Sequence, residues 1–230
     1  MQRVFDVIFS GLAILVLSPL LMPIILILRV TGEGEVFFLQ DRIGRDGKLF
    51  KLYKFATMLK DSPNMGSGTV TLSDDPRVLP LGSVLREYKI NELPQLINIF
   101  KGDMSVIGPR PQTKRCFNAF SEEVRQDILK VRPGLSGLGV LIIYNEERMM
   151  KSHEDADSFY DDVIMAYKGV LEQWYVRNNS VTLYFMLIAA TLVALVTKSS
   201  ATLFKLYPTL PIVPEALLPF ILPDAHQDDK

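Results

Sequence analysis

The sequence has little of what several classes of protein depend on. Its 230 residues include one cysteine, Cys116, so an intrachain disulfide framework is excluded and a reducing compartment is favoured. The formal net charge of −1 argues against a nucleic-acid-binding protein that relies on bulk attraction to phosphates. We expect one domain with a proper core, because two domains and a membrane segment would need a longer chain.

What the sequence does have is a long apolar run near its start. Residues 7–30 have about the length that crosses the hydrocarbon core of a bilayer, with Arg3 and Asp6 before the run and Arg29 at its end. A cleaved signal peptide is the alternative, but the run is too long for the apolar part of one and no small-residue cleavage site follows it. The run therefore predicts a membrane segment.

Two prolines lie in the middle of this run. Pro19 and Pro23 each lack the N–H group that a helix interior needs, so we expect the helix to break there, with Ser18 helping to satisfy the freed backbone. A kinked spanning helix and a re-entrant hairpin that enters and leaves by the same face both remain open. Positive charges after the run place that side in the cytoplasm, and Arg3 with the α-amino group gives positive charge before it, which favours the hairpin.

Two short strand patterns follow the membrane segment. Residues 35–40 and 48–55 flank a Gly-Arg-Asp-Gly turn at 44–47, which predicts a β-hairpin. Its basic residues form either a solvated face or a surface for anionic lipid headgroups.

The most informative stretch is polar and lies near the middle of the chain. Residues 92–100 carry apolar side chains at helical spacing, which predicts a short amphipathic helix with Asn91 as its N-cap and its end at Gly102. A helix start gathers free N–H groups and a partial positive charge, so it suits phosphate binding and holds a nearby carboxylate ionised. Glu92 lies at that predicted start.

A turn rich in glycine and proline follows. Gly108 permits unusual backbone angles, and Pro109 and Pro111 fix φ on either side of Arg110. A guanidinium held between two rigid neighbours can make a preorganised bidentate contact to a phosphate or another planar acceptor. A Pro-rich surface turn with a solvated arginine is the alternative, and the spacing alone does not decide between them.

The C-terminal half is predicted to be mostly helical. Residues 121–131 indicate a capped helix that stops before Arg132 and the sequence Pro-Gly-Leu-Ser-Gly, which is either a phosphate loop or a plain turn. Residues 181–196 form a second apolar run at the short edge for spanning, so an in-plane or buried helix is favoured before a Pro-rich apolar tail. Residues 146–174 are read as a helical scaffold, with core spacing at Phe159, Val163, Ala166, Tyr167, Val170 and Trp174.

Four motifs occur in order along the chain: Asn-Glu-Leu-Pro-Gln at 91–95, Lys-Gly-Asp-Met-Ser at 101–105, Gly-Pro-Arg-Pro at 108–111 and Val-Arg-Pro-Gly-Leu-Ser-Gly at 131–137. Together, and in this order, they resemble the bacterial sugar transferases, in particular the small monotopic phosphoglycosyl transferases. The resemblance covers roughly residues 1–180. It implies transfer of a phosphosugar from a UDP-sugar to a polyprenol phosphate, with Mg²⁺, and release of UMP.

The resemblance also implies the residues of the site. The family's usual catalytic pair is Asp-Glu, and this chain has Asn91 and Glu92, which are the predicted catalytic and Mg²⁺-binding residues. Where family members commonly have an arginine, this chain has Ala56, so one customary positive charge is missing. The predicted substrate-binding residues are Lys54, Arg86, Pro109, Arg110, Pro111 and Arg132.

Together, the patterns and the resemblance predict an α+β fold in three regions: a Pro-broken re-entrant membrane helix at 1–30, a small, mostly helical phosphoglycosyl transferase domain with the short hairpin at 31–180, and an apolar membrane-associated or interfacial helix with a Pro-rich tail at 181–230. The implied location is the bacterial inner membrane, with the active site facing the cytoplasm. The implied partners are UDP-sugar, polyprenol phosphate, membrane lipids, downstream glycosyltransferases and, as one option, a second copy in a homodimer. Nucleic acid is not an expected partner.

The resemblance implies an enzyme for the first membrane step in assembling O-antigen, capsule or exopolysaccharide, with undecaprenyl phosphate as acceptor. A non-catalytic membrane homologue that binds nucleotide-sugar or lipid and acts through partner enzymes is the alternative. Asn91 is the support for that alternative, because an amide cannot carry the phosphosugar as an acyl phosphate. Three explanations of Asn91 remain open: an engineered exchange, a variant that transfers directly to the acceptor with Glu92 as base, and a catalytically inactive homologue.

Overall fold

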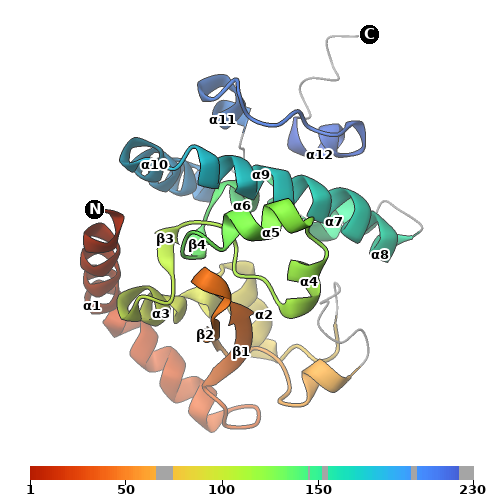
Figure 1. The fold of residues 1–230 in the computed structure, drawn as a ribbon. Coiled ribbons are helices and arrows are strands. Elements are labelled where there is room, and N and C mark those ends of the chain that lie inside the picture. Colours follow the sequence, from red (N-terminus) through yellow and green to blue (C-terminus); the bar gives the residue numbers. More distant parts are fainter. Residues whose placement is uncertain (66–74, 145, 152–154, 198–200, 223–230) are drawn as a thin grey trace. The chain divides into compact units, whose positions relative to one another are not determined.

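The computed structural model describes residues 1–65, 75–144, 146–151, 155–197 and 201–222 (Figure 1). The end of the Pro-rich tail, from residue 223, lies outside them. The chain packs into two units, each assembled from separate segments. Unit 1 contains Met1–Gln2, Arg42–Leu49 and Asp103–Lys230, and unit 2 contains Arg3–Asp41 and Phe50–Gly102. The predicted division at residues 30 and 180 stays a prediction.

Unit 2 holds the N-terminal helix, most of the predicted hairpin and the central polar stretch. Strands β1 and β2 pair as predicted for the hairpin, with β1 placed two to three residues later than expected. The main elements are α1 (Gln2–Val30), β1 (Phe37–Ile43), β2 (Leu49–Phe55), η2 (Ser62–Asn64), α2 (Pro80–Glu87), η3 (Ile90–Glu92) and α3 (Gln95–Lys101).

Helix α1 is continuous, so the expected break at the prolines is not observed as an interruption of the helix. The lost hydrogen bond is replaced locally. Pro19 has no N–H to donate to the Leu15 carbonyl, and the Ser18 hydroxyl donates to that carbonyl at 2.7 Å. The predicted role of Ser18 is therefore confirmed, and the ribbon of α1 changes direction along its length (Figure 1), as interior prolines commonly cause.

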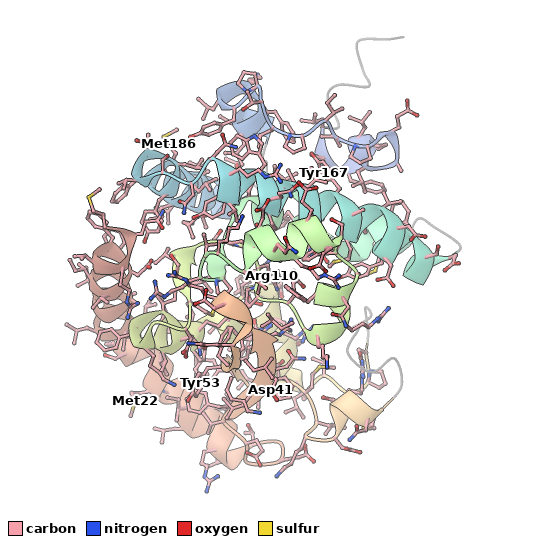
Figure 2. The ribbon with its side chains drawn as sticks, viewed as in Figure 1. Met22, Asp41, Tyr53, Arg110, Tyr167 and Met186 are labelled. Carbon is pink, nitrogen blue, oxygen red and sulfur yellow. The ribbon has the colours of Figure 1, made fainter. Side chains whose placement is uncertain are left out.

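Much of α1 is apolar and exposed. Leu15 is 70% exposed and Met22 55%, and Met22 projects outward in Figure 2. In the described part of the chain, α1 is the one helix with the length and composition to cross a membrane. Its other side packs into unit 2, where Ile24 and Leu28 form a core cluster with residues of β2 and α2. An exposed apolar surface of this extent needs lipid or another apolar surface to cover it.

A buried amide fixes α3 to β2. Asn98 is fully buried; its Oδ1 accepts the Tyr53 N–H at 3.0 Å and its Nδ2 donates to the Lys51 carbonyl at 2.8 Å. The side chain thus pairs with β2 as a neighbouring strand would. Gly102, with φ +100°, ends α3 as predicted.

Unit 1 contains a short parallel sheet and most of the helices. The predicted capped helix is confirmed as α5, where the Ser121 hydroxyl accepts the Val124 N–H, and the second apolar run is confirmed as α10. The elements are η1 (Arg45–Gly47), β3 (Ser105–Ile107), α4 (Lys114–Asn118), α5 (Glu122–Ile128), β4 (Gly134–Ser136), α6 (Leu138–Ile142), α7 (Glu146–Lys151), α8 (Ala156–Phe159), η4 (Tyr160–Met165), α9 (Ala166–Arg177), α10 (Val181–Thr197), α11 (Ala201–Leu206), η5 (Glu215–Leu217) and α12 (Leu218–Ile221).

Strands β3 and β4 pair in parallel, with Ser105 opposite Gly134, which the sequence did not predict. Glycines let the two backbones approach. A Cβ added at Gly134 would lie 2.1 Å from the Gly108 nitrogen, and one at Gly137 would lie 2.1 Å from the Gly108 carbonyl oxygen. The glycines of both motifs therefore serve close backbone contact.

The predicted scaffold helix is divided, and this changes which residues are buried. The π-helical turn η4 adds a residue to the helical repeat and rotates the buried face of α9. Lys168 and Glu172 lie on that buried face. Among the predicted core positions, Phe159 and Tyr167 are buried, whereas the prediction was wrong for the exposed Ala166 and Val170.

Candidate functional site

The first group of predicted site residues meets in unit 2. Lys54 Nζ lies 3.1 Å from Glu92 Oε1, and both side chains are about one-fifth exposed, at 20% and 18%. Asn91, next to Glu92, is buried. Arg86 is half-buried near the end of α2, where its Nη1 lies 3.8 Å from Met58 Sδ. The structure thus brings a cation from β2 to the carboxylate beside Asn91.

The backbone that presents Glu92 is tight and locally strained. We call residues 89–92 the Glu92 turn. Lys89 has φ 56° and ψ 18°, a left-handed conformation that costs about 1–2 kcal/mol for a residue with a side chain. The Glu92 N–H donates to the Lys89 carbonyl at 3.2 Å. The predicted N-cap role of Asn91 is wrong, because Lys89 starts a separate turn, Asn91 lies inside that turn, and Pro94 takes the N-cap position of α3.

The second group lies in unit 1, in residues 108–112, which we call the Arg110 turn. The Gly134 N–H donates to the Pro109 carbonyl at 2.8 Å, and Arg42 Nη1 donates to the Pro111 carbonyl at 3.0 Å. Both prolines therefore contribute an anchored carbonyl as well as a fixed φ. The turn is held by tertiary contacts on both sides of Arg110, whose side chain is half-buried.

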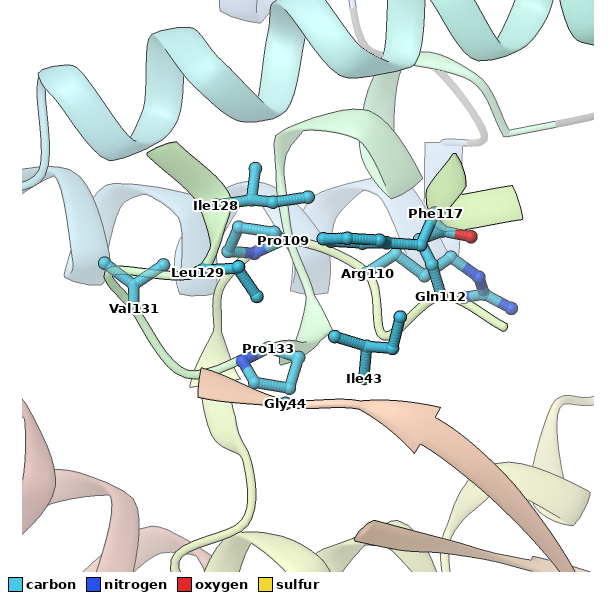
Figure 3. A pocket seen from close by; sticks show the side chains of 10 residues that line it. All are labelled: Ile43, Gly44, Pro109, Arg110, Gln112, Phe117, Ile128, Leu129, Val131 and Pro133. Atoms are coloured by element: carbon cyan, nitrogen blue, oxygen red, sulfur yellow. The ribbon is translucent and has the colours of Figure 1, made fainter. Parts of the chain in front are cut away.

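A small cavity lies beside the Arg110 turn. Its volume is about 20 Å³, room for roughly one water molecule, so as it stands it cannot hold a nucleobase. Figure 3 shows Arg110 and Gln112 together at one end, beside Phe117. The other lining residues are Ile43, Gly44, Pro109, Ile128, Leu129, Val131 and Pro133.

A carboxylate that the sequence analysis missed supports the Arg110 turn from α9. Glu172 is 1% exposed, and its Oε1 accepts the Arg110 backbone N–H at 3.2 Å. Its Oε2 is buried without a hydrogen-bond partner. Burial raises the pKa of Glu172 to about 7, although the Arg110 N–H and the positive charges of Lys168 and Arg110 act in the opposite direction.

Other ionisable groups lie around Lys168 and Arg110, the two cations that act on this carboxylate. Lys168, one turn earlier on α9, is 3% exposed, and its Nζ pairs with Glu146 Oε1 at 2.5 Å. Burial raises the pKa of Tyr160 well above its usual range, with the negative charge of Glu146 and the neighbouring Cys116 adding to the effect. Arg110 acts on Tyr160 in the opposite direction. The turn is thus backed by charged groups of both signs, of which Lys168 and Glu172 are buried.

Arg132 is half-buried just before β4, and the residues after it are part of the strand pair. The Gly134 N–H is occupied by the Pro109 carbonyl, and the Ser136 carbonyl accepts the Gly108 N–H at 3.0 Å. The phosphate-loop interpretation is therefore wrong for Gly134, because its backbone donor is already used.

The predicted Mg²⁺ ligands, Asn91 and Glu92, offer one amide oxygen and one carboxylate. Oxygen donors of this kind suit Mg²⁺, which commonly takes one or two carboxylates and completes its shell with substrate phosphates and water. No group of three or more His, Cys, Asp or Glu side chains arranged for a metal occurs among the residues that the structure describes. The Mg²⁺ site at Asn91 and Glu92 stays a prediction.

The predicted site residues thus fall into two groups, each inside its own unit. Their catalytic and binding roles stay predictions. The sequence did contain a signal for the missed residues: Tyr167, Leu171 and Tyr175 mark an apolar face of α9 at helical spacing, and Lys168 and Glu172 lie next to it. The first group is Lys54, Arg86, Asn91 and Glu92, and the second is Pro109, Arg110, Pro111 and Arg132.

This chain is similar to several known proteins of bacteria. The chain is 31% identical over 207 residues to the exopolysaccharide production protein ExoY of Sinorhizobium fredii, covering 84% of each chain. It is 38% identical over 143 residues to the UDP-glucose:undecaprenyl-phosphate glucose-1-phosphate transferase of Escherichia coli, covering 60% of this chain and 30% of that one. It is 37% identical over 138 residues to the UDP-N-acetylgalactosamine-undecaprenyl-phosphate N-acetylgalactosaminephosphotransferase of Aeromonas hydrophila, covering 59% and 32%. The chain therefore spans about a third of the length of the last two relatives.

The names of the last two relatives agree with the predicted enzyme class, the phosphoglycosyl transferases. Residues 1–198 match the family described as bacterial sugar transferase, and they include every predicted site residue. The predicted family is confirmed: the chain belongs to the bacterial sugar transferases.

Proposed function

We propose that this chain transfers a phosphosugar from a UDP-sugar to undecaprenyl phosphate and releases UMP, in the first membrane step of assembling O-antigen, capsule or exopolysaccharide. The observation that carries the proposal is the family match over residues 1–198. Two relatives support the acceptor, since their names specify transfer to undecaprenyl phosphate.

The composition of unit 2 supports a lipid-linked acceptor. The same unit contains the exposed apolar helix α1 and the Lys54–Glu92 pair. An acceptor whose tail stays in the bilayer can react only at a group that belongs to the membrane-bound part of the protein. We propose that α1 is that membrane-bound part, in the inner membrane, with the site on the cytoplasmic side.

The chemistry requires stabilisation of negative charge. An oxygen of the acceptor phosphate attacks the sugar-bearing phosphorus of the UDP-sugar, the P–O bond to UMP breaks, and UMP leaves with the electron pair. Glu92 takes the proton when the attacking phosphate carries one. The ammonium of Lys54 stabilises charge on the phosphate oxygens near Glu92. Arg110, in unit 1, has a separate proposed role, which is to hold the uridine diphosphate. Mg²⁺, when held by Asn91 and Glu92, supplies further charge neutralisation of these oxygens.

Asn91 supports a second candidate function. An amide is a poor nucleophile, so a covalent phosphosugar on this residue is not expected. The chain then either transfers directly, as written above, or is a non-catalytic homologue that binds nucleotide-sugar or lipid for partner enzymes. A homodimer and downstream glycosyltransferases stay predictions.

Release of UMP decides between these functions. Purified full-length protein is incubated with undecaprenyl phosphate, Mg²⁺ and a panel of UDP-sugars. We expect UMP from at least one sugar, with an unchanged intact mass of the protein. Asn91→Asp is expected to create or restore a phosphosugar adduct visible in that mass. Nucleotide-sugar binding without UMP would favour the non-catalytic homologue, and an adduct on the parent chain would exclude direct transfer.

The membrane topology is tested by labelling. We propose that both ends of α1 face the cytoplasm, because positive charge occurs at both ends. In a Cys116→Ser background, Gln2→Cys and Lys48→Cys are expected to be shielded from an impermeant thiol reagent outside intact cells. Labelling at residue 2 alone would show a spanning helix.

A further inference from the structure

Glu172 occupies a position that the proposed reaction leaves unexplained. Its buried carboxylate accepts one backbone N–H, that of Arg110, while Oε2 lies buried without a hydrogen-bond partner. An incompletely satisfied buried carboxyl group is costly. A role limited to packing would be served at lower cost by an apolar residue of similar volume.

The carboxylate is confined between two backbone segments. On one side lies the Arg110 N–H. On the other side α6 has no side chain at Gly139, where an added Cβ would lie 2.6 Å from Glu172 Oε1 and 3.2 Å from its carboxyl carbon. A change in the position or charge of this carboxylate therefore acts directly on the backbone of the Arg110 turn.

The charged and titratable groups around Lys168 and Arg110 belong to five elements or segments. Lys168 lies on α9 itself and pairs with Glu146 on α7. Arg110 comes from the turn, and Tyr160 on η4 and Cys116 on α4 complete the set. Since burial raises the pKa of Glu172 to about 7, its carboxyl group is neutral below that pH and ionised above it. The ionised form adds a negative charge beside Arg110.

We propose that Glu172 is a positioning residue for nucleotide binding: it orients the Arg110 turn through the Arg110 N–H, and its charge sets how strongly that turn attracts a diphosphate. The inference rests on the proposed function for its ligand, the diphosphate of a UDP-sugar. It goes further by assigning control of that ligand's binding to a residue that acts through Arg110.

The first test needs no ligand. The amide resonance of Arg110 is followed by NMR in micelles from pH 6 to pH 8. It is expected to titrate in the parent and to stay constant in Glu172→Gln, whose amide oxygen still accepts the N–H but carries no charge. An Arg110 amide that does not titrate in the parent overturns the inference.

The second test measures UDP-glucose affinity by calorimetry at pH 6 and pH 8, a range in which its diphosphate keeps its charge. The parent is expected to bind about fivefold more weakly at pH 8. One pKa unit of coupling gives about tenfold at the high-pH limit, and about half of that is reached at pH 8 because the carboxyl group is then only partly ionised with ligand bound. Glu172→Gln is expected to bind equally at both pH values. Gly139→Ala, which displaces the carboxylate without removing it, is expected to bind weakly at both.

Asp127→Asn is the matched control, because Asp127 is a buried carboxylate that bonds to α9 residues and stays ionised from pH 6 to pH 8. It is expected to keep the parent's pH dependence. Equal pH dependence in the parent and Glu172→Gln, or no binding of UDP-glucose by the parent at pH 6, overturns the inference. Neither test reads UMP release, so a chain that binds but does not turn over contradicts the proposed function and leaves this inference standing.

Discussion

The Glu92 turn and the Arg110 turn each hold one charged side chain in place, by different means. The Glu92 turn is shaped by its own backbone, with left-handed Lys89, and its carboxylate reaches a partly exposed lysine. The Arg110 turn is shaped from outside: Arg42 and Gly134 donate hydrogen bonds to its carbonyls, and the buried Glu172 accepts the Arg110 N–H. Local strain fixes the first turn, and tertiary contacts fix the second.

Because the two turns are held differently, substitutions in them are expected to differ in their effects on activity and on folding stability. The Lys54–Glu92 pair is about four-fifths buried, so the cost of desolvating both charges offsets much of their mutual attraction, and the pair contributes little net stability. A buried hydrogen-bonded group is costly to disturb. We therefore expect changes in the Glu92 turn to affect activity with little effect on stability, and changes behind the Arg110 turn to affect both.

The largest expected effect is that of Glu92→Gln on turnover. The variant keeps the shape of the side chain but loses the proposed base and the charge that faces Lys54, so UMP release is expected to fall by about 100-fold or more. The midpoint of thermal unfolding is expected to stay close to that of the parent.

Asp41→Asn is its control, since it breaks an exposed lysine–carboxylate pair with Lys51 in the same unit. The control is expected to retain UMP release. If Glu92→Gln turns over as fast as this control, Glu92 has no role in the reaction.

Arg110→Lys is expected to weaken UDP-sugar binding by about tenfold or more. A point charge cannot reproduce a bidentate guanidinium contact, and hydrogen bonds to charged groups contribute about 1.5–3 kcal/mol. Calorimetric titration with UDP-sugar measures the loss. Arg45→Lys, at an arginine whose side chain is 50% exposed in the hairpin turn, serves as the matched exchange. Parent-like binding by Arg110→Lys would make the turn purely structural.

Asp127→Asn is expected to lower the free energy of unfolding by about 1–2 kcal/mol at pH 7, because Asp127 accepts charge-assisted bonds from Lys130 and Arg177. The Lys130 hydrogen bond chiefly lowers the pKa of Asp127 from 3.8 to about 2, against the effect of burial. The contribution is therefore complete above pH 3.8 and is lost as the pH falls towards 2. Denaturant unfolding at pH 7 and pH 2.5 should show the difference between parent and variant shrinking; a constant difference would contradict the assignment.

The same comparison explains what the sequence could predict. Local patterns were sufficient for α1, the hairpin, the Ser121 cap and the helix end at Gly102, because each depends on residues close in sequence. The β3–β4 pair was missed, since its strands are three residues long and depend on glycines that are distant in sequence. Glu172 was missed because η4 rotates α9, so a regular helical repeat assigned the wrong buried face.

The smallest expected effect concerns the strain in the Glu92 turn. Lys89→Gly removes the cost of a left-handed side-chain-bearing residue, about 1–2 kcal/mol, but adds backbone entropy to the unfolded chain, about 0.5–1 kcal/mol. The net stabilisation is therefore expected to be at most about 1.5 kcal/mol, measured by denaturant unfolding. Asp46→Gly is the control in the hairpin turn, with φ 57°, and its stability should increase less because Asp tolerates this conformation better.

Lys89→Gly is also expected to affect activity. Since glycine loosens the turn that presents Glu92, UMP release is expected to fall a few-fold while stability rises. Lys89→Asn, which keeps the left-handed preference with a side chain, should retain activity. Loss of stability in Lys89→Gly would show that contacts of the lysine side chain outweigh the backbone strain.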